Sequence, residues 1–194
     1  MQREELESIL MKHRNLNINY LEDNKENIFK IIPELRDEDG FDQKNEWHKY
    51  NVWKHTEVAL SNSKYDIEER VVLLLHDIGK PFSYQEDGNI RHFKGHAQKS
   101  AEMSRTILKR LNYSDEKIER ICWLIGNHSS RIDAEKINKD NIEIIMKLLD
   151  IQYCDAKAYN PNMVKNATDK LDCIRREVWK KCDELNKDDD LLEK

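Results

Sequence analysis

Turn-forming residues are scarce in this chain, which has five glycines and three prolines among 194 residues. A β-sandwich or barrel needs such residues at each of its many corners, whereas long helices joined by short loops need few. Apolar residues also recur at helical spacing along almost the whole sequence. We therefore predict an all-α fold that forms one globular unit, because no linker is long enough to separate two domains.

The apolar spacing places the expected helices. The first ends near Asn15, and a short second one, marked by Ile28, Ile31 and Ile32, precedes Pro33. A third follows the polar loop at residues 37–47 and contains Val52 and Trp53. Asp66 can cap the next helix, whose run VVLLLHDIG is apolar on all sides and is therefore expected to be central. Four further helices are marked by residues 97–111, 114–125, 142–159 and 171–185, and the charged tail KDDDLLEK is expected to fray.

Residues 81–94 interrupt this periodicity. Their turn signal, Asp87–Gly88–Asn89, predicts a loop or a small hairpin over the functional site.

The charge balance limits the classes of partner. With 33 Lys and Arg against 38 Asp and Glu, the formal net charge is −5, which argues against an extended nucleic-acid surface. A small phosphorylated substrate needs only a few basic residues. No segment approaches the ~20 apolar residues that span a bilayer, and the first residues lack the apolar core of a signal peptide. We expect a cytoplasmic protein without a membrane partner.

Cysteine spacing gives no sign of a disulfide framework or a CxxC pair. The four cysteines are expected to be buried free thiols, and they are Cys122, Cys154, Cys173 and Cys182.

The most informative residues are His76 and Asp77, which are adjacent at the end of the most apolar helix. An ionised aspartate is costly to bury unless it is paired or bound to a cation. Imidazole nitrogen with carboxylate oxygen suits Mn, Fe, Zn, Ni or Co better than Ca. The pair is therefore a candidate for metal binding.

Other candidate ligands stand at helix ends or on apolar helix faces. They are His55 in KHTEVAL, His96 in HFKGHAQKSAEM, His128 in GNHSSRI and Asp155 in YCDAKA. Six candidates thus fall on five successive helices. Gly95 is expected to permit close backbone approach before His96. Asp150 and Asp169 are alternatives to Asp155, which is preferred because Ala156 and Ala158 leave room for close helix packing.

These motifs resemble the HD-domain superfamily of metal-dependent phosphohydrolases over about residues 45–160. The string HDIGKP followed by F-x-GH is similar to the HD domains attached to bacterial tRNA nucleotidyltransferases. The resemblance implies an HD-domain helical bundle with a metal site in its core, at residues 45–160. Residues 1–44 would be an N-terminal helical extension with no nucleotidyltransferase domain, and residues 161–194 a C-terminal helix and charged tail.

The resemblance also implies roles for individual residues. His55, His76, Asp77 and Asp155 match the ligands of one metal, whereas His96 and His128 match those of a second. Asp77 then matches the bridging carboxylate. The implied cofactor is a divalent transition metal, as two ions of Fe, Mn, Ni, Co or Zn. The implied catalytic residues are Asp77 and Lys80, and Lys80 would face the substrate phosphate.

The expected function is hydrolysis of a phosphomonoester or phosphodiester of a nucleotide-like substrate by metal-activated water. Additional substrate contacts are expected from Arg91, Lys94 and Arg131. The alternative is a non-catalytic HD module that binds a nucleotide or an RNA end. His48 is expected to be structural, His92 is a minor candidate for substrate contact, and the four tryptophans are expected to be core or rim aromatics.

Overall fold

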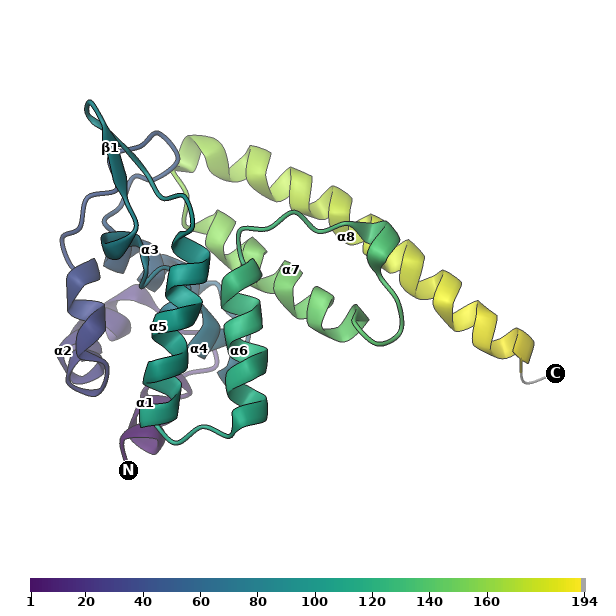
Figure 1. The fold of residues 1–194 in the computed structure, drawn as a ribbon, viewed down its shortest axis with the longest axis horizontal. Helices are drawn as coiled ribbons and strands as arrows, with labels where there is room; N and C mark the ends of the chain where they lie inside the picture. Colours follow the sequence, from purple (N-terminus) through teal and green to yellow (C-terminus); the bar gives the residue numbers. More distant parts are fainter. Residues whose placement is uncertain (193–194) are drawn as a thin grey trace.

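The structure is a computed structural model that describes the backbone of residues 1–192 and the side chains of residues 1–185. Helices make up most of this part of the chain (Figure 1). The α-helices are α1 (Gln2–Leu10), α2 (Ile18–Ile31), α3 (Val52–Ser61), α4 (Ile67–Leu75), α5 (His96–Arg110), α6 (Asp115–Asn127), α7 (Ile142–Lys157) and α8 (Pro161–Leu192). Three 3₁₀ turns join them, namely η1 (Pro33–Glu38), η2 (Lys80–Phe82) and η3 (Ala134–Lys136).

Helix α4 lies at the centre of the fold, as its apolar sequence predicts. Each residue from Val71 to Leu75 is at most 1% exposed, and the helix packs against α1, α3, α6 and α7. Its first turn is fixed by Asp66, whose side chain accepts a hydrogen bond from the backbone N–H of Glu69 at 3.0 Å. The residues that follow α4 are therefore held in the interior of the bundle.

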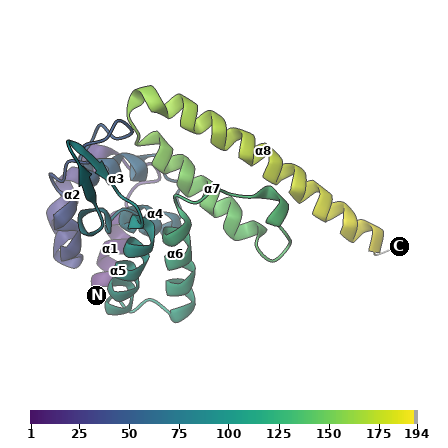
Figure 2. The same cartoon turned by 45° about the horizontal axis from the view of Figure 1, so that its top comes forward.

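Four of the other helices form two pairs. Helices α5 and α6 run side by side, as do α7 and α8 (Figures 1 and 2). The second half of α8 extends past the rest of the molecule in both views. Between η2 and α5, strands β1 (Gln85–Asp87) and β2 (Ile90–His92) form the expected antiparallel hairpin, in which Asp87 pairs with Ile90.

The N-terminal segment is attached to the core by the buried guanidinium of Arg70. This group donates hydrogen bonds to the backbone carbonyls of Leu10 at 2.6 Å, His13 at 3.0 Å and Arg14 at 2.7 Å. Carbonyls at a helix end lack partners within the helix. Their capture by Arg70 explains why α1 ends at Leu10 rather than near Asn15.

Two helices are longer than the apolar pattern suggests. Helix α2 begins at Ile18, because the side chain of Asn17 caps it by accepting from the N–H of Tyr20 at 2.8 Å. Helix α8 starts directly at Pro161, a residue suited to a first helical turn, and it continues to Leu192 through the tail that was expected to fray. Residues 193 and 194 lie outside the described part.

The cysteine prediction is partly wrong. All four thiols are free, but only Cys122 and Cys154 are buried, whereas Cys173 is exposed and Cys182 half-buried on α8. The reason is that α8 has the bundle on one side only. Along the backbone that the structure describes, no helix is both long and apolar enough to cross a membrane.

Candidate metal centre

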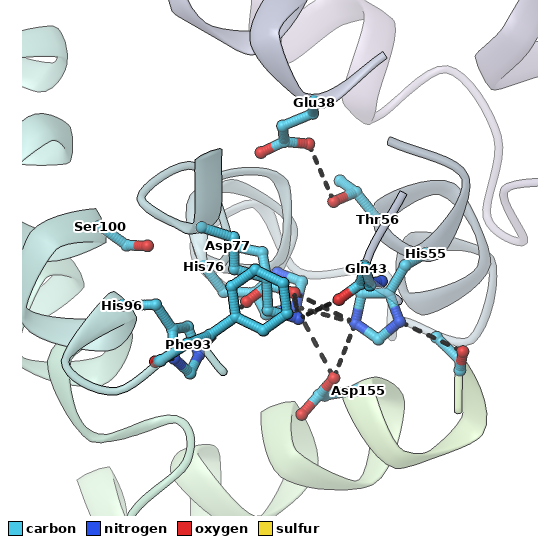
Figure 3. A network of polar contacts seen from close by, with 12 residues as sticks. Glu38, Gln43, His55, Thr56, His76, Asp77, Phe93, His96, Ser100 and Asp155 are labelled. Atoms are coloured by element: carbon cyan, nitrogen blue, oxygen red, sulfur yellow. Dashed lines mark hydrogen bonds and ion pairs between the residues drawn. The ribbon is translucent and has the colours of Figure 1, made fainter. Parts of the chain in front are cut away.

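The fold brings all six candidate ligands into one buried region. Figure 3 shows His55, His76, Asp77, His96 and Asp155 of this set. Each comes from a helix or from the residue that follows one: His55 from α3, His76 and Asp77 directly after α4, His96 from the first turn of α5, His128 directly after α6, and Asp155 from the last turn of α7.

Backbone carbonyls orient the four imidazoles. Nδ1 lies 2.7 Å from the carbonyl oxygen three residues earlier in His76, His96 and His128. In His55 it lies 3.2 Å from the carbonyl oxygen of Ala158. A carbonyl oxygen can only accept, so Nδ1 carries the proton in each ring. Nε2 is therefore the ring nitrogen that each histidine can offer to a cation, in exchange for any proton it carries.

The first group of ligand atoms, the inner cluster, consists of His55, His76 and Asp155. Nε2 of His55 lies 2.9 Å from Oδ1 of Asp155 and 3.3 Å from Nε2 of His76. Oδ2 of Asp77 lies 3.4 Å from Nε2 of His55 and 3.3 Å from Nε2 of His76. One carboxylate oxygen of Asp77 thus faces this cluster.

The second group, the outer cluster, consists of His96 and His128, whose Nε2 atoms are 3.1 Å apart. Oδ1 of Asp77 lies 3.4 Å from Nε2 of His96 and 3.7 Å from Nε2 of His128. The other oxygen of Asp77 therefore faces this cluster, and the carboxylate lies between the two.

The donors fit a divalent transition metal. In both clusters two Nε2 lone pairs face each other at hydrogen-bonding distance, an arrangement that is repulsive without a cation or proton between them. Oδ1 of Asp77 is buried and accepts no hydrogen bond from the described residues, an arrangement that is costly unless a cation binds there. Imidazole and carboxylate ligands suit Mn, Fe, Co, Ni and Zn. The cluster can therefore hold a metal.

Electrostatics within the site favour cation binding. Burial raises the pKa of Asp77 and Asp155, but the neighbouring histidines, and Lys80 beside Asp77, outweigh burial and hold both pKa values well below the usual range. Burial lowers the pKa of His76, yet the charges of Asp77 and Asp155 prevail and raise it to about 10. Burial lowers the pKa of His128 to about 3. Two buried carboxylates thus remain ionised and attract positive charge.

Lys80 is buried against Asp77. Its Nζ lies 2.7 Å from Oδ2 of Asp77 and donates a hydrogen bond of 2.7 Å to Oε1 of Gln43. Its side chain also lines a cavity of about 240 Å³ whose wall includes Asp77, His96 and His128. The ammonium is therefore placed beside the candidate ligands and not in bulk solvent.

The other candidate basic residues differ in how free they are. Arg91 donates to Glu86 at 2.8 Å and to the carbonyl of Asp42 at 2.6 Å, and its guanidinium lies 4.6 Å from the ring centres of both Phe41 and Tyr84. These contacts hold the hairpin in place. Lys94 and Arg131 are exposed and line larger cavities beside the clusters.

The alternative aspartates lie elsewhere. Asp150 forms ion pairs with Lys64 and with Arg175, the latter at 3.1 Å. Asp169 is exposed and pairs with Lys165 at 2.5 Å. Of the three aspartates considered, Asp155 is the one that the fold brings to the histidines.

Gly95 has a different role from the one expected. A Cβ at this position would meet no atom within 4 Å, so close packing does not require glycine there. The backbone conformation requires glycine instead. Gly95 is the N-cap of α5 with a φ of +84°, a left-handed conformation that residues with a side chain rarely adopt. Close approach occurs instead at Gly79, where a Cβ would lie 2.6 Å from the backbone nitrogen of Ser100.

Three residues of the site were not predicted to be there. His48 packs its ring 5.0 Å from that of His55 and lines the cavity of the clusters. Tyr159 donates a hydrogen bond of 3.1 Å to Oδ2 of Asp155, and Gln43 contacts Lys80. His48 and Gln43 come from the loop before α3. The spacing of seven between His48 and His55 was the one available signal, and it is indirect because α3 begins only at Val52.

Comparison with known proteins agrees with this architecture. The HD-domain family matches residues 48–157, a range that contains all six candidate ligands. The CC-adding tRNA nucleotidyltransferase of Thermus thermophilus is 31% identical over 96 residues, which cover 46% of this chain and 22% of that protein. The A-adding tRNA nucleotidyltransferase of Deinococcus radiodurans is 30% identical over 139 residues, covering 66% of this chain and 32% of that protein.

These relatives are much longer, since the matched region covers a third or less of either one. The family match extends over residues 48–157, which is more than half of this chain. On the match and on the helical architecture that carries its His–Asp motif, the chain belongs to the HD-domain family.

Proposed function

We propose that this protein is a metal-dependent phosphohydrolase that holds two divalent transition-metal ions, one at the inner and one at the outer cluster. The observation that supports this most is the position of Asp77, whose two carboxylate oxygens face two separate pairs of histidine Nε2 atoms. A carboxylate in this position is suited to bridging two cations. Fe, Mn, Ni, Co and Zn fit the donors.

The chemistry follows from the residues around the cavity. Cations bound there would supply the Lewis acidity that polarises a phosphoryl oxygen and acidifies an attacking water. Lys80 is already buried beside Asp77 and would place a positive charge next to the substrate phosphate. Tyr159 and the carbonyl of Ala158 would hold Asp155 and His55 in the ligand geometry.

The substrate class is a small phosphorylated, nucleotide-like molecule. The net charge of −5 gives little attraction for a long polyanion, while a few basic side chains near the cavity suffice for one or two phosphates. Free thiols on α8 suit a reducing compartment, so we expect the enzyme to act in the cytoplasm.

Turnover by metal-loaded protein tests the proposal. Protein supplemented with Mn, Co, Ni or Fe should hydrolyse p-nitrophenyl phosphate, bis(p-nitrophenyl) phosphate or members of a nucleotide panel, and a chelator should abolish the activity. The Asp77→Ala variant should be inactive with every metal. Measurable nucleotide binding without turnover under any of these conditions would instead favour a non-catalytic nucleotide- or RNA-end-binding module.

The role of Lys80 has its own test. Lys80→Ala should lower kcat by about tenfold or more, because a charge beside the phosphate is lost in the transition state, while metal content stays unchanged. Lys109→Ala is the matched control. Lys109 lies near the C-terminal end of α5, about 20 Å along the helix from His96 at its first turn. Equal kinetics of the two variants would remove Lys80 from the mechanism.

A further inference from the structure

Two larger cavities flank the cavity of the metal clusters. The first, the hairpin cavity, has a volume of about 790 Å³ and shares the side chains of His48, Phe93 and Tyr159 with the central cavity. The second, the helix cavity, has a volume of about 300 Å³ and shares His128, Asp155 and Tyr159 with it. The candidate ligands therefore lie between two separate spaces.

Trp47 and Tyr159 separate the two flanking cavities. Both residues line both cavities, and their ring centres are 6.3 Å apart. Tyr159 also lines the central cavity. A molecule that occupies both flanking cavities therefore has to pass this aromatic pair, of which Tyr159 lines the central cavity together with Asp77 and Lys80.

The hairpin cavity suits a flat aromatic group. Its walls include the rings of Trp47, His48, His92 and Phe93, and its volume falls in the range of small-molecule sites. Aromatic side chains stack on nucleobases regardless of their identity. The cavity is large enough for a nucleoside.

The helix cavity is smaller and has a different chemistry. It lies between the segment that follows α6 (residues 128–132), α7 and α8, with hydroxyl groups from Ser129 and Ser130 and apolar contacts from Leu171 and Ile174. Such walls suit a sugar or another small organic group.

Each flanking cavity has basic side chains without a partner. Lys94 lines the hairpin cavity, and Arg131 and Lys170 line the helix cavity. Among the described side chains, none of these three has a hydrogen-bond or ion-pair partner. In an acidic chain where many cations are paired, they leave positive charge on both sides of the clusters.

We infer that the substrate is a phosphodiester whose phosphorus lies in the central cavity, with a nucleoside in the hairpin cavity and a second organic group in the helix cavity. This inference rests on the proposed function and makes its substrate class specific. A phosphomonoester has a single organic group and leaves one flanking cavity without an occupant. Hydrolysis adds a water oxygen to phosphorus, breaks one P–O ester bond and transfers a proton from water to the departing alcohol, giving a phosphomonoester and an alcohol.

Substrate preference is the first test. Metal-loaded full-length protein is assayed with the dinucleotide ApA and with AMP, and separately with bis(p-nitrophenyl) phosphate and p-nitrophenyl phosphate. In each pair kcat/KM should be at least about tenfold higher for the diester, because binding in the second cavity contributes to transition-state stabilisation. A monoester that is hydrolysed as well as its matched diester, or better, overturns the inference while leaving the proposed hydrolase intact.

Variants then locate the two groups. Lys94→Ala and Arg131→Ala should each raise KM for ApA by about tenfold through the loss of one charged contact. Lys109→Ala, at the far end of α5, is the control and should leave KM for ApA unchanged. Unchanged ApA kinetics in both cavity variants contradicts the two-sided site.

Binding to metal-depleted protein separates failure of the inference from failure of the proposed function. Without metal, ApA should bind at least about tenfold more tightly than AMP by calorimetry, and Arg131→Ala should remove most of the difference. If no ester is hydrolysed with any metal, the hydrolase proposal fails, and this affinity ratio still decides the inference. Equal affinities for ApA and AMP overturn it.

Discussion

Three of the four clustered histidines are oriented by the carbonyl three residues earlier, which belongs to the helix end or turn that carries the histidine. The positions of His76 and His128 can be predicted from the sequence, because each directly follows a helix whose apolar residues are recognisable in the sequence. The orientation of His55 could not be predicted from the sequence, since its partner is the carbonyl of Ala158, about a hundred residues later. It depends on how α7 packs against α3.

The choice among aspartates is a residue-scale prediction. Asp155→Asn keeps the side-chain volume but removes the charge next to His55 and His76, so metal affinity should fall by at least about tenfold. Asp150→Asn is the matched control and should leave metal affinity unchanged, because Asp150 pairs with Lys64 and Arg175. Competition with a chromophoric chelator measures both affinities. A larger loss in the Asp150 variant would reverse the assignment.

Glu38 gives a pH-dependent prediction. It is buried, one of its oxygens accepts from Thr56 at 3.2 Å, and the other has no partner among the described residues. Burial, reinforced by the negative charge of Asp77, raises its pKa from 4.5 to about 8. A carboxyl with a raised pKa contributes stability below about pH 4.5 that is lost as the pH rises to about 8.

Replacing Glu38 by Gln should remove this loss. In chelator-treated protein, the free energy of unfolding of Glu38→Gln relative to wild type should rise by roughly 2–4 kcal/mol between pH 5 and pH 8.5. Urea denaturation at both pH values measures it. A difference that does not change with pH would mean that Glu38 titrates near its ordinary pKa.

At the scale of elements, the turn after α4 determines how the two clusters meet. Gly79 donates its backbone N–H to Oγ of Ser100 at 2.9 Å, and a Cβ on Gly79 would lie 2.8 Å from the carbonyl oxygen of His96. The turn that carries Asp77 and the first turn of α5 are thus in direct backbone contact. This explains why glycine stands in the HDIGKP string.

Gly79→Ala should therefore destabilise the protein by about 1–3 kcal/mol and weaken metal binding at His96. Gly126→Ala is the control. Gly126 lies within α6, and a Cβ there would make an ordinary 3.7 Å contact with Ala101 of α5. This substitution should be neutral or stabilising by up to about 1 kcal/mol. Chemical denaturation compares the two, and equal stabilities would show that the turn adapts without cost.

Elements were predicted well where apolar residues are periodic and capped. Helix α4 with Asp66, and α6 with Ser114, are examples. The first half of α2 was not predicted, because the polar run at residues 22–27 separates its first apolar residues from Ile28 and breaks the helical pattern. The loop before α3 has no periodicity, so its delivery of His48 and Gln43 to the site could not be foreseen.

At the scale of the whole molecule, the order of the motifs predicted that five helices meet at one centre, and the structure brings all six candidate ligands there. The flanking cavities were beyond the reach of the sequence. They form where the hairpin, the end of α7 and the start of α8 approach one another, and no spacing within a single element encodes that approach.

The number of bound metal ions tests the central proposal most directly. After anaerobic or metal-supplemented preparation, elemental analysis should find close to two transition-metal ions per chain, because Asp77 faces two pairs of histidines. The His96→Ala, His128→Ala double variant should retain about one ion. A His13→Ala, His92→Ala double variant, which leaves both clusters intact, should retain two. A supplemented wild type that saturates at one ion, with no decrease in the His96, His128 variant, would contradict the two-metal centre.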